Sequence, residues 1–418
     1  MKTAEIQHLA KYIAEFQDRF DPLFRRPETR RWAREYVGGL LMDMERKNCW
    51  QIAEARRIPA EHLKSLQHFL YGSAWPWRPV IDEMARLVDE HLGHEDGLVV
   101  VDESGVRRWG RKSVGIARQY IGNVGKVENG QVGVYLTYAS DAGQGFLDAR
   151  LYLPREWMND PSRGDEAGLP RGVVFRTKPQ LAAAMVEAAA RRGLRARWLT
   201  ADETYGQDGA FREVVDAVGW WYVAEVPVKQ HVWVGRPARG DAVRGSSRNA
   251  RNSAFYGLSM RVDALARGFS ERAWQRIQVA EGTLGRRVYE FAFRRVVERC
   301  GRRPGREGWL MVRRSLDQEP EIKYFLSNAP STADPERMAV VGSERWRVES
   351  CVKEAKGQTG LDESEGRNWN HWHHHTALSM LAHAFLACAR VRWGKTHFPP
   401  VGTANEETGR SGTRRTVA

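Results

Sequence analysis

The sequence predicts an α/β fold that carries a helical N-terminal region and a mainly β insertion. Two apolar runs that end in acidic residues, "GLVVVDES" and "LRARWLTADETYG", alternate with amphipathic stretches of helical period. Buried strands that alternate with helices are typical of an α/β core with a partly parallel sheet. Upstream of this core the apolar residues recur at helical spacing, and downstream of it they alternate as in antiparallel strands.

Residues 1–94 are predicted to form a helical domain. Within it, "WQIAEARRIPAEHLKSLQHFLYGS" is predicted to contain two short amphipathic helices on either side of "IPA". This pattern is typical of a helix–turn–helix motif. The second helix would turn Lys64, Gln67 and His68 outward, which makes them candidate DNA-contacting residues. An ordinary helical hairpin fits the same pattern equally well.

The rest of the chain divides into four predicted parts. Residues 95–227 form the first part of the core, with strands in "QVGVYLTYAS", "GFLDARLYLP" and "WWYVAEVP" and helices in "KPQLAAAMVEAAARRG" and "DGAFREVVDAVG". Residues 228–335 form the β-rich insertion. Residues 336–395 return to the core with two helices, of which the second is apolar nearly all round and therefore buried. Residues 396–418 are polar and are expected to be disordered.

The composition points to a polyanionic partner. The net charge is +13 and the isoelectric point about 9.7 in a chain that also has 16 Trp, which favours nucleic acid over other partners. The four cysteines are scattered without a CxxC pair, so we expect a reducing, cytoplasmic setting. Neither a signal peptide nor a membrane span is expected from the apolar patterning.

Two aspartates stand where a catalytic metal site would be built. Asp102 follows "VVV" and Asp202 follows "WLTA", so each is placed at or near the carboxyl end of a central strand, the edge at which α/β sheets bind ligands. Carboxylate oxygens in such a place favour Mg²⁺ or Mn²⁺. For each aspartate taken singly, a helix N-cap or a turn is an equally common role. Glu103 and Glu203 would point the other way and form a less favoured pair.

A third carboxylate is predicted on the helix in "RWRVESCVKEAK". Arg345, Glu349 and Lys356 fall close together on a helical wheel, beside a separate apolar stripe. A solvated ion-pair ladder is the simplest explanation of such a helix taken alone. Glu349 borders the apolar face, which makes it the candidate third metal ligand, whereas Glu354 is expected to be solvated.

These segments resemble those of a known family. "VVDESG", "LTADETYG" and "RWRVESCVKEAKGQTGLD" resemble the Asp, Asp and Glu segments of the DDE transposases, and Arg345, Glu349 and Lys356 match the Arg–x3–Glu–x6–Lys signature of the IS4-like group. "MERKNCWQIAEA", "KSVGIARQYIGNVGKVENGQVGVYLTYAS" and "LYLPREWMND" resemble the IS701 family of insertion-sequence transposases, over about residues 15–395. Gly342 replaces the aromatic residue of the signature, and Ser104 stands where relatives have Thr.

The resemblance implies an RNase H-like catalytic core whose β insertion separates the second Asp from the Glu. It implies that Asp102, Asp202 and Glu349 are catalytic and hold Mg²⁺, for which Mn²⁺ can substitute. Arg345 and Lys356 would contact DNA phosphates. The implied function is a DNA transposase that binds the ends of an insertion sequence, cleaves them and joins the 3′-OH ends to target DNA.

The implied partners are the terminal inverted repeats and the target, both double-stranded DNA, and a second copy of the chain in a homodimer, at a bacterial nucleoid. Two alternatives remain: a domesticated or non-transposing metal-dependent nuclease of the same fold, and a catalytically idle DNA-binding repressor.

Two further groups of polar residues are candidate binding residues. Lys112, Arg118 and Lys126 are predicted to follow the DNA backbone. "HWHHH" resembles a metal-binding run, but its dense spacing distributes the imidazoles around a helix axis, so a solvated or DNA-facing run is expected. Its four histidines are His371, His373, His374 and His375.

Overall fold

The structure is a computed structural model that describes residues 3–239, 255–256, 258–282, 285–300 and 303–394. Its contacts group the chain into two compact units. Unit 1 contains Met1–Gly93, Glu103–Arg176 and Glu349–Ala418, and unit 2 contains His94–Asp102 and Thr177–Val348. Both units are discontinuous in sequence, and each is described here by itself. The predicted domain boundaries stay a prediction.

Unit 1 begins with helices whose apolar faces are buried. Trp32, Tyr36 and Leu40 of the second helix are buried, as are Leu66, Phe69 and Leu70 of the fourth, because residues three or four apart share one face. The helices are α1 (Thr3–Phe20), α2 (Pro27–Leu40), α3 (Cys49–Ala55), α4 (Leu63–Tyr71) and α5 (Trp77–Leu92).

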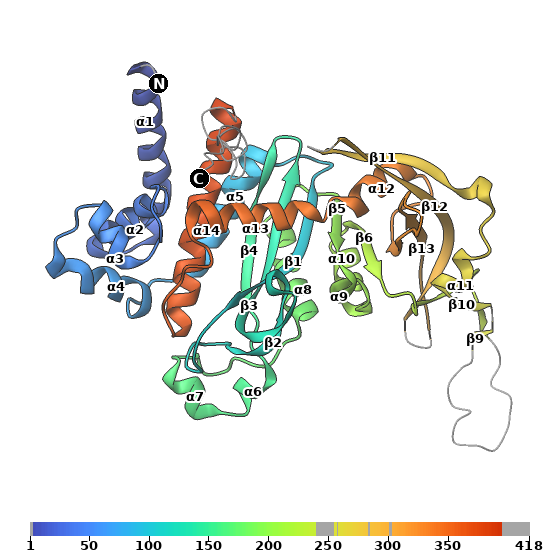
Figure 1. Cartoon of the computed structure of the whole chain (residues 1–418), viewed down its shortest axis with the longest axis horizontal. Coiled ribbons are helices and arrows are strands. Elements are labelled where there is room, and N and C mark those ends of the chain that lie inside the picture. The colour runs from blue at the N-terminus through green and yellow to red at the C-terminus, as the bar shows by residue number, and fades with distance from the viewer. Residues whose placement is uncertain (1–2, 240–254, 257, 283–284, 301–302, 395–418) are drawn as a thin grey trace, which may run out of the picture. The chain divides into compact units, whose positions relative to one another are not determined.

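The remainder of unit 1 combines strands with two long helices. Strands β2 (Ala117–Ile121), β3 (Lys126–Ser140) and β4 (Gly143–Leu151) pair antiparallel in the order β2–β3–β4, and two short helices, α6 (Arg155–Met158) and α7 (Pro161–Glu166), follow. Helix α14 (Trp369–Trp393) contacts α2, α4, α5 and β4 (Figure 1). Packing on several sides explains why this helix is apolar nearly all round.

Unit 2 is built on a mixed sheet. Strand β1 (Leu98–Arg107) begins in this unit and pairs parallel with β5 (Trp198–Ala201), which pairs parallel with β6 (Trp221–Val226). Helices α8 (Lys178–Arg191), α9 (Glu203–Gly206) and α10 (Gly209–Ala217) connect β5 and β6 to their neighbours along the chain. This confirms the predicted alternation of strands and helices.

The sheet of unit 2 continues into the segment predicted as the β insertion. From β6 the strand order is β14–β13–β12–β7–β10, with β11 paired to β12, and all of these pairs are antiparallel. The strands of this sheet are β7 (His231–Trp233), β10 (Ser259–Arg261), β11 (Gln275–Gly282), β12 (Gly285–Cys300), β13 (Arg303–Arg314) and β14 (Ile322–Ser327). Strands β8 (Ala238–Arg239) and β9 (Phe255–Tyr256) pair antiparallel in a separate two-stranded sheet. Helix α11 (Val262–Ala266) lies in this segment, and α12 (Pro335–Ser343) and α13 (Trp346–Thr359) follow it.

The expectation of a solvated or DNA-facing histidine run is wrong. His371, His373, His374 and His375 are all buried in unit 1. The ring of His374 stacks on Trp75, and that of His373 stacks on Trp77. The periodicity of α14 did not reveal this, because Trp75 and Trp77 belong to a segment nearly 300 residues earlier in the chain.

The expectation for Glu354 is also wrong. Its side chain is only 12% exposed, accepts a hydrogen bond of 2.8 Å from Arg390 and lies 3.5 Å from Nε2 of His383. Both partners belong to α14, so the face of α13 that carries Glu354 is covered by another helix. A wheel drawn for α13 alone could not show this packing.

The predicted disordered tail, residues 396–418, lies outside the described residues. So does most of the basic Gly-rich stretch that follows β8. Within the described part of the chain, none of the helices has the length and apolar character needed to cross a membrane.

Candidate active site

The two predicted aspartates follow the paired segments of neighbouring strands in unit 2. Strands β1 and β5 pair as far as Val101 opposite Ala201, and Asp102 and Asp202 are the residues that come directly after this pair. Neighbouring parallel strands are about 4.8 Å apart, so both aspartates are brought to the same edge of the sheet. One detail differs from the prediction: β1 continues to Arg107, so Asp102 marks the end of its pairing with β5 and not the end of the strand.

Asp202 caps the short helix α9. Its backbone remains extended, with φ −75° and ψ −178°, and its Oδ1 accepts hydrogen bonds from the backbone N–H groups of Thr204 at 2.9 Å and Tyr205 at 3.4 Å. The N-cap role that the sequence left open is therefore present. The cap fixes the carboxylate at the strand edge, since a side chain bound to two backbone N–H groups has lost its rotational freedom.

Asp102 is paired with an arginine that sequence reasoning had assigned only to DNA. Nη1 of Arg345 donates to Oδ2 of Asp102 at 2.7 Å. The aspartate side chain is 13% exposed and the arginine 33% exposed, so the pair is neither fully buried nor free in solvent. A cation thus stands beside the first of the two carboxylates.

Helix α13 begins one residue after Arg345 and carries the other signature residues. The predicted apolar stripe is confirmed, because Val348, Cys351, Val352 and Ala355 are all buried. Glu349 follows Arg345 by one helical turn and is exposed. Lys356 is half-buried in unit 1, where burial lowers its pKa below the usual value and the charge of Asp362 opposes that shift.

The chemistry of these residues fits a divalent cation. Asp102 and Asp202 supply only oxygen atoms, the ligands that Mg²⁺ and Mn²⁺ prefer, and the guanidinium on Asp102 shows that positive charge is accommodated at this edge. In the described part of the chain, no three His, Cys, Asp or Glu side chains are already gathered closely enough to hold a metal ion.

The predicted DNA-contacting residues outside this site are on the surface. Lys64, Gln67 and His68 are exposed on α4, as the helical period predicted. Lys112 and Arg118 are exposed in unit 1, where Lys112 lies 3.6 Å from Glu166. Lys126 is also exposed and lies 3.0 Å from Glu128. Their positions allow contact with DNA but do not test it.

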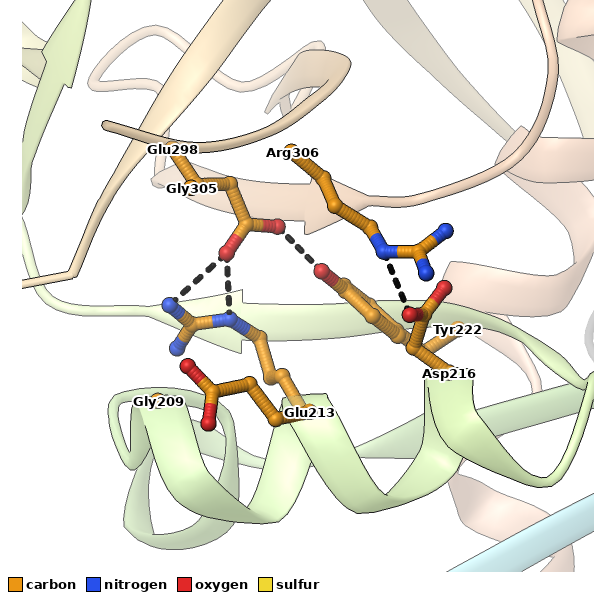
Figure 2. Close-up of a pocket in the computed structure, with 8 residues that line it drawn as sticks. Gly209, Glu213, Asp216, Tyr222, Glu298, Gly305 and Arg306 are labelled. Carbon is orange, nitrogen blue, oxygen red and sulfur yellow. Dashed lines mark hydrogen bonds and ion pairs between the residues drawn. The ribbon is translucent and has the colours of Figure 1, made fainter. Parts of the chain in front are cut away.

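A pocket of about 310 Å³ lies elsewhere in unit 2, between α10 and the β12–β13 hairpin (Figure 2). Four of its charged side chains, Arg212, Glu298, Asp216 and Arg306, are paired with one another. Arg212 donates to Glu298 at 3.0 Å, Tyr222 donates to the other oxygen of Glu298, and Arg306 pairs with Asp216. Because Arg212 and Glu298 are almost fully buried, we interpret this network as structural.

A family model described as "DDE superfamily endonuclease" matches residues 19–286, more than half of the chain. The chain belongs to the DDE superfamily endonucleases. This membership confirms the predicted RNase H-like α/β fold. The matched range includes both aspartates and ends before Glu349, so the third carboxylate rests on the signature spacing alone.

This DDE superfamily member is also similar to a curated protein, the "Probable transposase for insertion sequence element IS701" of Microchaete diplosiphon. The two are 29% identical over 226 residues, which are 53% of this chain and 55% of the relative. The aligned part thus spans about half the length of that relative.

Proposed function

We propose that this protein is a DNA transposase that binds the ends of an insertion sequence, cleaves them and joins the freed 3′ ends to target DNA. The observation that carries the proposal is the register of β1 and β5, in which the pair Val101–Ala201 is followed on each chain segment by one of the two aspartates, Asp102 and Asp202. The family match and the name of the IS701 relative support this chemistry over other uses of a carboxylate pair.

Asp102, Asp202 and Glu349 would hold divalent cations, Mg²⁺ or in its place Mn²⁺. When bound, such ions activate a water molecule and stabilise the negative charge that develops on the leaving oxygen. The reaction is hydrolysis of a phosphodiester followed by attack of the released 3′-OH on a phosphodiester of the target. Each step exchanges one P–O bond for another, so no external energy source and no covalent protein–DNA bond are needed.

Basic and polar side chains of the protein would position the DNA. Arg345 and Lys356 flank Glu349 in sequence and would contact phosphates beside the scissile bond. Lys64, Gln67 and His68 on α4, with Lys112, Arg118 and Lys126 in unit 1, would bind double-stranded DNA of the terminal inverted repeats or of the target. We further propose that two copies hold two ends together as a homodimer, in the cytoplasm at the nucleoid.

The test is a cleavage assay on DNA that spans each end of the element. The wild type is expected to nick the ends when Mg²⁺ or Mn²⁺ is present and to leave them uncleaved when EDTA removes the metal. Asp202→Asn should reduce cleavage by about 10³-fold or more, since it removes a charged ligand from the site, and should retain binding to the ends. Asparagine caps a helix as well as aspartate does, so this variant keeps the cap on α9.

Asp208→Asn is the matched control. Asp208 caps α10 by accepting a hydrogen bond from Phe211 N at 3.1 Å, so the control makes the same chemical change at the next helix start, and it should cleave like the wild type. Binding without cleavage by the wild type would favour the repressor. Equal cleavage of unrelated DNA would favour a general nuclease.

A further inference from the structure

Arg108, which follows strand β1 in unit 1, is fixed at its backbone and at one nitrogen of its side chain. Its backbone N–H donates to the carbonyl oxygen of Asn129 at 3.0 Å, and Nδ2 of Asn129 donates to the carbonyl oxygen of Arg108 at 2.9 Å. Nε of the guanidinium donates to Oε1 of the buried Gln131 at 2.9 Å. A guanidinium that is held at Nε keeps the donors of its two Nη groups for another partner.

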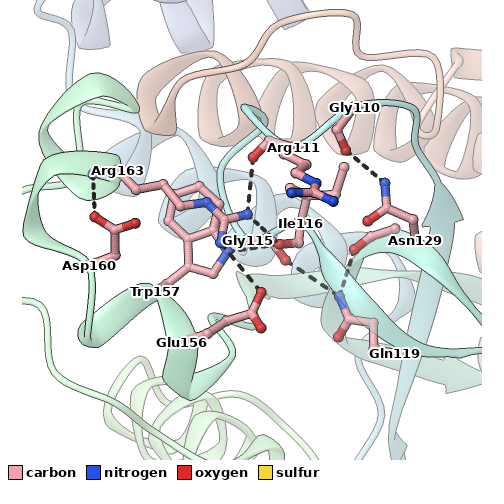
Figure 3. A network of polar contacts seen from close by, with 11 residues as sticks. Gly110, Arg111, Gly115, Ile116, Gln119, Asn129, Glu156, Trp157, Asp160 and Arg163 are labelled. Carbon is pink, nitrogen blue, oxygen red and sulfur yellow. Dashed lines mark hydrogen bonds and ion pairs between the residues drawn. The ribbon is translucent and has the colours of Figure 1, made fainter.

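The loop that continues from Arg108 is held by further polar contacts (Figure 3). Nδ2 of Asn129 also donates to the carbonyl oxygen of Gly110 at 2.8 Å. Nη2 of Arg163 donates to the carbonyl oxygens of Arg111 at 3.0 Å and Ile116 at 2.9 Å. A group on a fixed loop loses little conformational entropy when it binds a partner, so the position of Arg108 is set in advance.

The segment that follows helix α13 lies beside Gln131. Val114 connects the two, because its carbonyl oxygen accepts a hydrogen bond from Nε2 of Gln131 at 2.6 Å and its N–H donates to the carbonyl oxygen of Arg367 at 2.8 Å. Helix α13 ends at Thr359, only eight residues before Arg367. The end of the helix and the anchored guanidinium therefore belong to one neighbourhood of unit 1.

Lys356, in the last turn of α13, belongs to the same cluster of charges. The positive charge of Arg108 acts on Lys356, and the negative charge of Asp362 acts on both. Glu365 also acts on Arg108. Burial lowers the pKa of both cations, while Asp362 opposes that shift. Two half-buried cations are thus placed near each other.

The charged ends of these two side chains are open. Among the residues that the structure describes, no carboxylate forms an ion pair with Arg108 or Lys356, and none of their nitrogens is buried without a partner. Their ends therefore reach solvent. A partly desolvated cation gains more from an anion than a fully hydrated one does. A phosphodiester brings one negative charge and two free oxygens, which match the two Nη groups of an arginine.

We propose that Arg108 and Lys356 bind one phosphate of duplex DNA between them, and that Gln131 is the positioning residue that orients the guanidinium. The inference rests on the proposed function, which supplies the DNA, and adds Arg108 and Gln131 to the residues that hold it. A glutamine suits this role because its neutral amide orients the arginine without cancelling the charge, whereas a carboxylate would compete with the phosphate.

The test measures the affinity of the full chain for a fluorescent duplex that spans one end of the element, by anisotropy in EDTA at several salt concentrations. Arg108→Gln should weaken binding about tenfold at low salt, the effect of one lost charged hydrogen-bonding group. It should also lower the slope of log affinity against log salt by about 0.9, the value for one phosphate contact on a duplex.

Arg107→Gln is the matched control. Arg107 is exposed, is the last residue of β1 and carries the same charge. Successive residues of an extended segment project from opposite faces, so this variant should weaken binding by less than about twofold. An equal loss in both variants would mean that net charge, and not the anchored guanidinium, governs the affinity.

A set of duplexes in which one phosphate at a time is replaced by an uncharged methylphosphonate tests whether the two cations share a phosphate. One replacement should weaken binding by the wild type about tenfold. Both Arg108→Gln and Lys356→Gln should respond less to the replacement at that same position. Responses lost at different positions, or wild-type affinity in Arg108→Gln, would overturn the shared site.

The positioning role of Gln131 is tested by a double-mutant cycle. Gln131→Leu removes the acceptor for Nε and should weaken binding about threefold, with no further loss when Arg108→Gln is already present. The same loss with and without Arg108 would show that Gln131 acts through the fold and not through the arginine.

Because EDTA prevents cleavage, these outcomes are separate from those of the end-cleavage assay. A wild type that cleaves the ends while Arg108→Gln binds normally would keep the proposed function and lose the phosphate site. A wild type that shows the shared phosphate but cleaves no DNA would keep the site and lose the proposed function.

Discussion

Two of the arginine–carboxylate pairs of unit 2 lie in very different settings. Arg212 and Glu298 join α10 to β12 with side chains 3% and 5% exposed, and Glu298 also accepts a hydrogen bond from Tyr222. Arg345 and Asp102 lie at the carboxylate edge of the sheet with side chains 33% and 13% exposed. The first pair is enclosed by its own partners, and the second is accessible from solvent.

The difference separates an ion pair that holds the fold from one that can exchange its partner. Removing one member of a buried pair leaves an uncompensated charge in the interior, which is costly. An accessible pair can be replaced by water or by another ion at little cost. A carboxylate that must accept a divalent cation is therefore better placed in the second setting than in the first.

The largest expected effect comes from breaking the enclosed pair. Glu298→Gln should lower the free energy of unfolding by about 3–5 kcal/mol, because Arg212 stays charged and buried without its partner. Denaturant titration of the full chain would measure this. Glu307→Gln breaks the exposed pair with Arg236 in the same region and should cost less than about 0.5 kcal/mol. Similar losses in both variants would refute the distinction.

A pH titration extends the comparison to buried groups without an ionic partner. Burial lowers the pKa of both His371 and His373 to about 3, so the folded state keeps them neutral while the unfolded state binds protons below about pH 6.5. Their contribution to stability is complete above about pH 6.5 and is lost progressively as the pH falls toward 3. Each histidine should lower the free energy of unfolding by about 2 kcal/mol when the pH falls from 7 to 5.

The control for this titration is the exposed His68. His68→Gln should leave the pH dependence of the unfolding free energy unchanged, because this side chain is exposed on α4 and folding does not remove it from solvent. A flat profile for the wild type between pH 7 and 5 would show that the α14 histidines are not kept neutral by burial.

Opening the accessible pair should have a smaller effect on stability and a measurable one on metal binding. Arg345→Gln should change the unfolding free energy by less than about 1 kcal/mol. It should raise the affinity for Mn²⁺ about fivefold, the equivalent of about 1 kcal/mol, because the cation competing for Asp102 is gone. Calorimetric titration with Mn²⁺ in the absence of DNA would measure this.

Arg347→Gln is the matched control for that titration. It removes one positive charge two residues further on, from a side chain that pairs with Glu344 at 3.0 Å. Its effect on Mn²⁺ affinity should be less than about twofold. An equal rise in both variants would mean that net charge, and not the contact with Asp102, governs metal affinity.

The smallest expected effect is a response to salt. Raising NaCl from about 0.1 to 1 M shortens the screening length from about 10 to 3 Å. The stability difference between wild type and Arg345→Gln should then vanish, while that between wild type and Glu298→Gln should persist. Loss of both differences at high salt would place the two pairs in the same class.

Much of the core could be predicted from sequence because local pattern determines it. The run "VVV" before Asp102 indicated a buried strand, which is present although it continues to Arg107. The helix ahead of Gly193 ends at Arg191, with the glycine at φ +75°. The outward side chains of α4 followed from helical period alone. In each case the deciding interaction lies within one or two helical turns, or within one strand.

What needed the tertiary structure was which elements face each other. Sequence reasoning assigned Arg345 to DNA and missed its pair with Asp102, because 243 residues separate the two. It placed the α14 histidines in solvent or against DNA, because several rings that cover them, those of Tyr36, Trp75 and Trp77, come from the start of the chain.

The sequence by itself determined the strands and helices, the three candidate carboxylates and the family to which they point. Only the tertiary structure decided that Asp102 and Asp202 follow a paired position of neighbouring strands, and that one arginine is enclosed while another is accessible. The physical reason is that hydrophobic period acts over a few residues, whereas register, burial and ion pairing depend on chain segments brought together by folding.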